Sequence, residues 1–355
     1  MFLESIWIQG FRALAEQRLS FTMPATAVEG NNGAGKTTLL DAVYFLASGK
    51  SSLGLTNAEL IRDGSPYFVV GGEYRAHDAV AGGIVHHTVQ AMFTSEGRKE
   101  VRIDGTVYRG FIHLIGGLRV ASFNFASIFL VKGLPSVRRQ FINLLAASSD
   151  HSYFEMLSAY SEVISHKNAL LRQSGAGVPD ASLLDLLDER IAVLSTAIQA
   201  KRHTVLGSVD RAMRQLISGG LFEAFSDVSI AYEPRAVSVE SLRSVREREL
   251  ARHACLAGCH LDDFSLMHRG KAFRESASLG EAKVMALLLT LAGAEYTRSV
   301  TGEYPVLLLD DLEGDIDMAN LERLLHLLVK FDQVFITSFD VARLGGGLNA
   351  QSVRL

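Results

Sequence analysis

The sequence is poor in the features that mark secreted and membrane proteins. Its 355 residues include only two cysteines, too few to hold a chain of this length together by disulfides. The first residues, MFLESIWIQG, lack the basic flank and long apolar core of a signal peptide. The longest strongly apolar run, Val284 to Ala294, is far shorter than a membrane span. We therefore expect a soluble protein in a reducing, cytoplasmic setting, with no membrane partner.

The chain also lacks an excess of one charge. It has 35 Lys and Arg residues against 39 Asp and Glu, which gives a net charge of −4. This total does not indicate a nucleic-acid partner, so any DNA-binding surface must be local. Hydrophobic residues make up 48 % of the chain, which indicates a globular protein with a sizeable core.

One motif is complete. Nine residues read GNNGAGKTT and fit the phosphate-binding loop pattern G-x-x-x-x-G-K-[ST]: Gly30, Asn31, Asn32, Gly33, Ala34, Gly35, Lys36, Thr37 and Thr38. Residues 25–28 can form a buried strand before it, and residues 38–46 place their apolar side chains on one helical face after it. Backbone N–H groups of such a turn hold phosphate oxygens, Lys36 reaches the outer phosphates, and the Thr37 hydroxyl binds Mg²⁺. The sequence therefore predicts a nucleotide site.

A P-loop of this kind needs a carboxylate strand, and PVLLLDD (residues 305–311) supplies one. Ligands bind where parallel buried strands end, so Asp310 is expected to hold Mg²⁺ and Asp311 to orient or deprotonate the attacking water. The pair taken alone is equally well an ordinary strand end. A further apolar run ends in Thr337 and Ser338, whose hydroxyls either face the γ-phosphate or mark an ordinary strand exit.

The segment Ser278-Leu279-Gly280-Glu281 precedes an apolar helix over residues 284–292. It resembles the signature motif of ATP-binding-cassette ATPases, which reaches across a dimer to the partner's γ-phosphate. Lys36 and Ser278 are 242 residues apart, whereas Ser278 and Asp310 are only 32 apart. More than 100 residues are therefore inserted between the two halves of an ATPase head.

The inserted region, from about Pro135 to His253, has helical periodicity. We expect three apolar stripes that form the core of a short antiparallel helical arm, each stripe only a few turns long and none a long coiled coil. The stripes are Val137, Phe141, Leu144 and Leu145; Phe154, Leu157, Tyr160, Ile164 and Leu171; and Leu183, Leu187, Ile191, Leu194 and Ile198.

Basic residues gather at both ends of this insert. One group is Lys132, Arg138 and Arg139, and the other is Arg243, Arg246, Arg248 and Arg252. Because acids are interleaved with the second group, it is either a solvated helix face or a surface for DNA phosphates. The set His253, Cys255, Cys259 and His260 has spacings that match no usual structural zinc pattern, so no zinc site is predicted.

The predicted fold class is α/β: a P-loop ATPase head of ABC/SMC type, assembled from N- and C-terminal segments, with an inserted mainly helical arm domain. The expected domains are residues 1–134, the half of the head with the P-loop; 135–253, the arm; and 254–355, the half with the signature segment and the carboxylate strand.

These motifs in this order resemble the RecF family of bacterial recombination mediators, which are related to the heads of SMC proteins. The likeness covers nearly the whole chain. It rests on Phe11-Arg12, VRIDG (101–105), LVKGLPSVRRQF (130–141), KNALLR (167–172) and REREL followed by GCHLDD (258–263).

The resemblance implies a slow ATPase that dimerises on binding ATP and Mg²⁺, binds DNA at gaps or single-strand to double-strand junctions, and recruits a RecR-type mediator that helps to load RecA. It implies roles in gap repair, replication restart and SOS induction, with ATPase activity stimulated by DNA. Arg12 would contact the nucleotide, and Ser278 and Gly280 would act in trans. Asp317 would contact the dimer partner, and His260 would lie near the nucleotide interface.

Several positions depart from the family pattern. Cys259 stands in place of proline, Leu261 in place of arginine and Glu281 in place of glutamine, where it adds negative charge beside a γ-phosphate. Residues 125–127 replace Pro-Glu-Asp, and the segment from Gly314 to Asp317 replaces Ser-Glu-Leu-Asp. Two alternatives therefore stay open: a transporter ATPase subunit, which the 242-residue separation disfavours, and a divergent module that binds ATP, turns over little and serves as a partner-recruiting clamp.

Overall fold

The computed structural model describes residues 1–78, 82–173, 180–312, 316–337 and 350–355. Its contacts divide the chain into two compact units. The head consists of Met1–Phe129, Ala212–Ser226 and Ala277–Leu355, and the arm consists of Leu130–Arg211 and Asp227–Ser276. The predicted boundaries at 134/135 and 253/254 fall inside the arm, because strands on both sides of residue 253 pair with each other there.

A parallel five-stranded sheet forms one layer of the head. Its strands are β3 (Ala25–Glu29), β8 (Val120–Phe123), β12 (Val306–Leu309), β13 (Val334–Thr337) and β14 (Ala350–Arg354), in the order β14–β3–β13–β12–β8. Every residue of β12 and β13 is buried, as expected for continuous apolar runs in a sheet covered on both faces. Strand β13 therefore lies between the strand that leads into the P-loop and the strand that leads into the aspartates.

An antiparallel sheet forms a second layer of the head. Its strands are β1 (Phe2–Phe11), β2 (Leu14–Ser20), β4 (Tyr67–Asp78), β5 (Gly83–Thr94), β6 (Lys99–Ile103) and β7 (Thr106–Arg109), in the order β2–β1–β4–β5–β6–β7. Asp104 and Gly105 join β6 to β7 with positive φ angles of 49° and 84°, as the tightest hairpin turns require.

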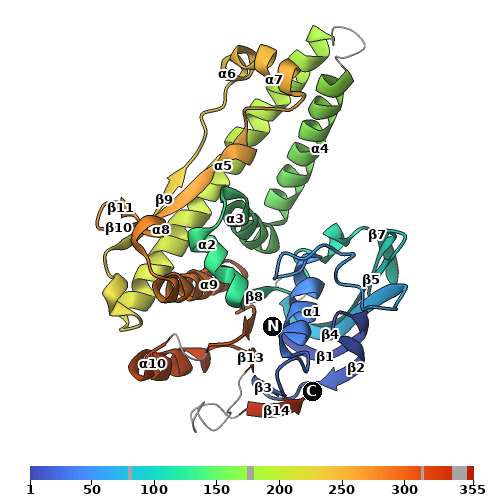
Figure 1. Ribbon diagram of the computed structural model, residues 1–355, viewed down its shortest axis with the longest axis vertical. Coiled ribbons are helices and arrows are strands. Elements are labelled where there is room, and N and C mark those ends of the chain that lie inside the picture. Colours follow the sequence, from blue (N-terminus) through green and yellow to red (C-terminus); the bar gives the residue numbers. More distant parts are fainter. Residues whose placement is uncertain (79–81, 174–179, 313–315, 338–349) are drawn as a thin grey trace. The chain divides into compact units, whose positions relative to one another are not determined.

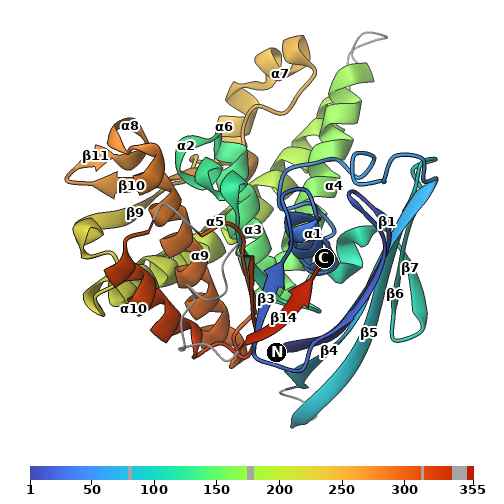
Figure 2. The same cartoon turned by 60° about the horizontal axis from the view of Figure 1, so that its bottom comes forward.

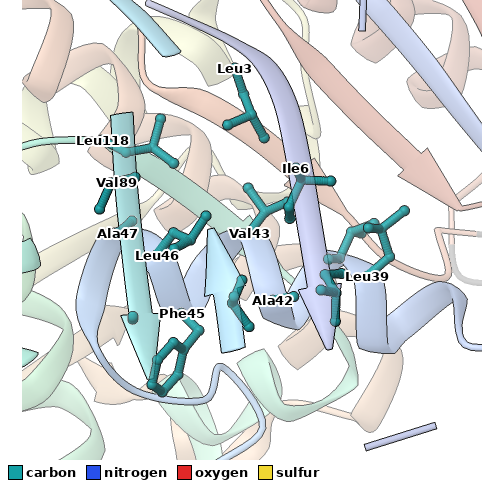
Figure 3. Packing of buried hydrophobic residues seen from close by; sticks show 14 of the residues in the cluster. Leu3, Ile6, Leu39, Ala42, Val43, Phe45, Leu46, Ala47, Val89 and Leu118 are labelled. Atoms are coloured by element: carbon teal, nitrogen blue, oxygen red, sulfur yellow. The ribbon is translucent and has the colours of Figure 1, made fainter. Parts of the chain in front are cut away.

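Helix α1 (Lys36–Ser48) lies between these two sheets. Figure 2 shows β3 and β14 side by side, with α1 between them and the antiparallel sheet. Leu39, Val43 and Leu46 are fully buried in one core with Ile6 (Figure 3). Phe335 belongs to the same core. The apolar face that the sequence predicts for this helix thus fixes the start of α1, and with it the P-loop, against both sheets.

Helices α9 (Leu279–Thr301) and α10 (Met318–Leu328) complete the described part of the head. Every residue from Val284 to Ala294 is buried, and α9 packs beside β8. The apolar run that is too short for a membrane span is therefore the centre of a core helix. Short 3₁₀ helices lie at Phe111–Leu114, Phe125–Ile128 and Glu223–Phe225.

The arm is mainly helical, as predicted (Figure 1). Its helices are α2 (Phe129–Lys132), α3 (Pro135–Ser149), α4 (His151–Gln173), α5 (Ala181–Ser218, whose last turns belong to the head), α6 (Val239–Ser244), α7 (Arg246–Arg252) and α8 (Phe273–Ser276). A three-stranded antiparallel sheet joins β9 (Val228–Glu233), β10 (Asp263–His268) and β11 (Lys271–Ala272). A 3₁₀ turn at Cys259–Leu261 precedes β10.

Two expectations for the arm helices are wrong in detail. The buried face of α3 is Arg138, Ile142, Ala146 and Ala147, one position from the predicted stripe, because Arg138 turns inward to pair with Asp263. The third stripe is not a few turns long, since α5 has 38 residues. Val205, Val209 and Met213 extend its buried face.

Candidate nucleotide-binding site

The P-loop is built as its sequence predicts, between strand β3 and helix α1. Three glycines in it have positive φ angles: 153° at Gly30, 84° at Gly33 and 107° at Gly35. A Cβ at Gly30 would lie 2.9 Å from the Ala34 Cβ, and one at Gly35 would lie 2.8 Å from Leu14 Cδ2. The backbone conformation therefore favours glycine at both positions, and at Gly30 the lack of space favours it too. The loop leaves Asn31, Asn32 and Gly33 exposed.

Lys36 opens helix α1 and folds its side chain over the loop. Its Nζ donates to the carbonyl oxygens of Gly30 at 2.6 Å and of Asn31 at 3.2 Å. The ammonium group is thus held at the mouth of the loop, beside backbone N–H groups at the positive end of a 13-residue helix. Thr37, the predicted Mg²⁺ ligand, is half-buried in the first turn of the same helix.

The two aspartates follow β12 at the edge where the P-loop follows β3. Asp310 is buried, and Asp311 is exposed with a positive φ of 52°. The Thr337 hydroxyl, at the end of the intervening strand β13, donates to Asp310 Oδ1 at 2.6 Å and accepts from the Asp311 N–H at 3.1 Å. Thr337 therefore connects the two acids, a role different from the contact with phosphate considered above; Ser338 lies outside the described residues.

A buried carboxylate below the P-loop was missed by sequence reasoning. Asp41 of α1 accepts hydrogen bonds from the Ser51 hydroxyl at 2.8 Å and from the backbone and hydroxyl of Ser52 at 2.7 and 2.8 Å. Arg12 donates to it at 3.4 Å, and the Asn124 amide donates to the Ser52 hydroxyl at 3.0 Å. Burial raises the pKa of Asp41, and the bonds from Ser52 and Ser51 oppose this. An acid inside the apolar run LLDAVYF was the available signal.

The signature segment begins helix α9. Ser278 is its N-cap, and a capping box joins it to Glu281: the Glu281 N–H donates to Ser278 Oγ at 3.2 Å, and the Ser278 N–H donates to Glu281 Oε2 at 2.7 Å. The carboxylate of Glu281 is thus bound at the positive end of its own helix, which offsets part of its charge. Leu279 beside it is 70 % exposed.

Helix α10 begins in the same way at Asp317. Its carboxylate accepts from the Asn320 backbone at 2.9 Å and from the Asn320 amide at 2.7 Å, and the backbone bond lowers the pKa of this exposed acid. The neighbouring positions Gly314 and Asp315 lie outside the described residues. Residues 125–127, a further departure from the family pattern, form a 3₁₀ turn capped by Asn124.

Residues of the GCHLDD segment (258–263) form hydrogen bonds and an ion pair within the arm. Cys259 is buried, and its carbonyl oxygen accepts from Arg202 at 2.6 Å. His260 Nδ1 lies 2.6 Å from the Tyr160 hydroxyl. Asp262 is paired with Arg202 at 2.8 Å, whereas Leu261 is partly exposed. Among the described residues, no three His, Cys, Asp or Glu side chains are grouped so that they could hold a metal ion.

In the first basic group Lys132 is exposed and donates to the Arg274 carbonyl oxygen at 3.0 Å, whereas the two arginines are bonded within the arm. Arg138 is only 3 % exposed and holds Asp263 through two bonds of 2.8 Å, and Arg139 donates to the Asp262 carbonyl oxygen. In the second group, Arg246 pairs with Asp185 and Asp188 at 2.6 and 2.7 Å. Arg243, Arg248 and Arg252 are exposed, and Arg243 also pairs with Asp185 at 3.3 Å. No described helix is long and apolar enough to cross a membrane.

Comparisons with known proteins extend over nearly the whole chain. Residues 2–346 match the family model described as the RecF/RecN/SMC N-terminal domain. The DNA replication and repair protein RecF of Gloeobacter violaceus is 31 % identical, with 95 % of this chain and 92 % of that protein covered. RecF of Geobacillus thermodenitrificans is 30 % identical, with 96 % and 93 % covered.

The fold gives the same result. A solved structure described as the recombination mediator protein RecF with ATP in the RecFOR pathway matches with a TM-score of 0.85 at 26 % identity, covering 96 % of this chain and 92 % of that one. An ABC/SMC-type head with an inserted helical arm is therefore confirmed as the fold class. The chain belongs to the RecF/RecN/SMC N-terminal domain family, and within it to the RecF group of DNA replication and repair proteins.

Proposed function

We propose that this protein is an ATP-dependent DNA-binding switch in recombinational gap repair, replication restart and SOS induction. The observation that carries the proposal is one edge of the head sheet. There a complete P-loop, an Asp310–Thr337 pair and Asp311 lie on adjacent parallel strands, in a chain similar to RecF proteins over 95 % of its length.

The residues present fit a nucleoside triphosphate with Mg²⁺. The space beside Gly33 is open, and the Lys36 ammonium group is already fixed at the loop. The Thr37 hydroxyl and the Asp310 carboxylate are the oxygen donors that Mg²⁺ prefers. Bound Mg²⁺ would neutralise phosphate charge. Gly30 to Thr38 would bind the phosphates, with Arg12 near them.

Hydrolysis would rest on Asp311. Its carboxylate accepts a proton from water as the water oxygen attacks the γ-phosphorus, and the bond from that phosphorus to the bridging oxygen of ADP breaks. We propose that turnover is slow and that hydrolysis releases the bound DNA. We propose that DNA stimulates this weak ATPase activity.

Binding of ATP would bring two heads together. The helix end at Ser278 and Gly280 presents an N-terminus suited to an anion, and we propose that it meets the partner's γ-phosphate. Exposed basic residues such as Arg248 and Arg252 would contact phosphates of a gapped duplex or a single-strand to double-strand junction. The further proposed partner is a RecR-type mediator, and the proposed location is the cytoplasm.

A second candidate is a divergent clamp that binds ATP but turns over little. The observation that favours it is the position of the Glu281 carboxylate at the N-terminus of α9. A second subunit's γ-phosphate would bring further negative charge to that position. The transporter alternative has no support from the family found here.

The experiment is fluorescence anisotropy of a labelled gapped duplex, with and without ATP–Mg²⁺, at two salt concentrations. Wild type, Lys36→Met and Asp311→Asn are compared. We expect tight binding only with ATP, weaker binding at higher salt, tighter binding for Asp311→Asn and none for Lys36→Met. Full ATP-dependent binding by Lys36→Met would sink the proposal. Phosphate release over many turnovers, with DNA present, separates the switch from the clamp.

A further inference from the structure

The antiparallel sheet of the head carries the single tryptophan of the chain. Trp7 of β1 alternates with Ile6 and Ile8, which are buried in the core with α1, so its side chain lies on the opposite face of the sheet. A Cβ at Gly71 of β4 would lie 2.2 Å from Trp7 Cε2. The indole therefore fills the space above Gly71, and a larger residue there would displace it.

The indole is also held at the next strand. Its Nε1 donates to Gln90 Oε1 on β5 at 3.3 Å, so the ring crosses β4 and reaches β5. Trp7 is nevertheless only half-buried. Because the ring is fixed at two points and part of its surface is open, an aromatic group can stack on it at little cost in side-chain freedom.

Two arginines lie on the same line across the sheet. Directly opposed residues of neighbouring strands form a row, which we call the Trp7 row: Arg18, Trp7, Gly71, Gln90 and Arg102. The side chains of opposed residues share one face of the sheet. Neighbouring strands are about 4.8 Å apart, so Arg18 lies one strand from Trp7, and Arg102 lies one strand beyond the residue to which the indole is bonded.

The arginines of the Trp7 row are available to a ligand. Arg18 and Arg102 are exposed, and within the described ranges no hydrogen bond or ion pair engages their guanidinium groups. The row itself contains no acid. It therefore presents hydrogen-bond donors for an anion on both sides of an aromatic ring.

Most acids of the neighbouring rows are bonded within the sheet. They accept hydrogen bonds from nearby donors: Glu73 from Ser5 Oγ at 2.9 Å, Glu100 from Arg98 at 2.6 Å and Asp104 from the Thr88 N–H at 2.8 Å. Glu16 on the edge strand β2 has no such bond to a described residue. The acids thus leave the guanidinium donors of the Trp7 row unengaged.

This arrangement fits an unpaired strand of nucleic acid. A base in a single strand has an open π-face that stacks on an aromatic side chain, and the phosphates on either side of it accept hydrogen bonds from arginine. The bases of an intact duplex stack on one another and do not offer that face. The Trp7 row therefore favours a single strand over a duplex.

We propose that the Trp7 row binds the unpaired strand beside the duplex in gapped DNA, with one base stacked on the Trp7 indole and the flanking phosphates bound by Arg18 and Arg102. The inference rests on the proposed function for the choice of DNA as the partner. It adds a site for the single-stranded side of the gap, on a different sheet from the one that carries the P-loop and the aspartates.

The single tryptophan allows a direct test in the unmodified protein. Its fluorescence is excited selectively, with and without ATP–Mg²⁺, while a short thymidine oligonucleotide, a gapped duplex or a blunt duplex is added. Anisotropy of a label on each DNA measures binding in parallel. We expect the oligonucleotide and the gapped duplex to quench Trp7, because a stacked base quenches an indole, and the blunt duplex to leave its fluorescence unchanged.

Variants test each part of the row by anisotropy. Trp7→Ala should weaken oligonucleotide binding by about fivefold to a hundredfold, and Trp7→Phe, which keeps an aromatic ring, by less. Arg18→Gln and Arg102→Gln should each reduce the slope of log affinity against log salt by about 0.7. Lys330→Gln is the matched control, since it removes an exposed cation of the head outside this sheet, and should leave the affinity within about twofold of wild type. Unchanged affinity for the blunt duplex shows that a variant is folded.

The outcomes separate this site from the proposed switch. Bound DNA with unchanged Trp7 fluorescence, no binding of the oligonucleotide, or equal affinity in Trp7→Ala and wild type would overturn the proposal. Quenching by a RecR-type mediator but by neither DNA would also overturn it, in favour of a protein-binding face. If the oligonucleotide quenches Trp7 while binding of the gapped duplex does not need ATP, the Trp7 row is supported and the proposed switch fails.

Discussion

The Thr337 hydroxyl lies 2.6 Å from Asp310 Oδ1 and 3.1 Å from the backbone N of Asp311. The hydroxyl donates its proton to the Asp310 carboxylate, the proposed Mg²⁺ ligand. Its oxygen accepts from the backbone N–H of Asp311, the proposed acceptor of a proton from water. Thr337 is itself buried. A single side chain on the middle strand thus sets the geometry of both acids.

The substitution Thr337→Val tests this bond with almost no change of shape. It leaves a buried carboxylate oxygen and a backbone N–H unpaired, and we expect a loss of about 1–3 kcal/mol in unfolding free energy. Urea denaturation measures this, and single-turnover hydrolysis should slow in parallel. Thr337→Ser, which keeps the hydroxyl, should retain most of the rate; equal behaviour of the two variants would contradict the assignment.

A buried charge cluster in the arm gives a second prediction. Lys167 Nζ lies 2.6 Å from Asp188 Oδ1 and 2.7 Å from Glu249 Oε2, and all three side chains are fully buried. Lys167→Met leaves two buried carboxylates without this cation, so we expect about 3–5 kcal/mol of destabilisation by urea denaturation. The control is Lys201→Met: that lysine is 46 % exposed and pairs with Asp150, and its loss should cost under about 1 kcal/mol. Similar losses for both variants would refute the prediction.

The P-loop and the strand and helix that flank it could be predicted because their signals are local. The P-loop glycines, Lys36 and Thr37 are adjacent in the sequence, and the strand and helix around them have clear apolar patterns. The joining of Asp310 to Thr337 could not be predicted, because it depends on strand order. Nothing in the sequence says that β13 pairs with both β3 and β12.

The arm shows where hydrophobic pattern reasoning fails. The predicted stripe of α3 is wrong by one position because Arg138, a charged residue, is buried against Asp263. In α5 the buried face includes Asp188, Ser195 and Arg202, which interrupt an apolar pattern and concealed the helix's full length. Buried charges are stabilised by ion pairs with residues distant in the sequence, and a single sequence does not reveal those partners.

His260 in the arm is expected to make the stability of the protein depend on pH. Burial lowers the pKa of His260 below its ordinary 6.5, and Arg139 acts in the same direction, while the Cys255 carbonyl, Asp262 and Glu249 oppose them. The folded state therefore binds fewer protons than the unfolded state as the pH falls through 6.5, and this contribution to stability is lost toward acid.

His260→Gln removes that titration. We expect the unfolding free energy of wild type, measured by urea denaturation, to fall more steeply between pH 7.5 and pH 5.5 than that of the variant, with a difference in slope of at most about 1.4 kcal/mol per pH unit. Other histidines titrate in both proteins and cancel in the comparison. Parallel pH profiles would show that His260 keeps an ordinary pKa in the folded protein.

The last prediction concerns Glu281, whose carboxylate is bound to the Ser278 N–H at 2.7 Å. Glutamine also completes a capping box, so Glu281→Gln should change the unfolding free energy by less than about 0.5 kcal/mol. Glu281→Ala keeps the Ser278 cap but loses the bond from the Ser278 N–H to the carboxylate, and should cost about 1 kcal/mol. Thermal or urea denaturation of the two variants checks these values.

The same two variants separate the effect of the Glu281 charge from the effect of its capping bond on ATP-dependent DNA binding. Glu281→Gln removes a negative charge from the helix end that we expect to meet the partner's γ-phosphate, so less ATP should be needed for half-maximal binding of a gapped duplex, by about threefold to tenfold. Glu281→Ala removes the charge but also loosens the helix start, and should gain less. If Glu281→Gln needs as much ATP as wild type, then α9 presents its charge away from the nucleotide, and the trans role of Ser278 and Gly280 fails with it.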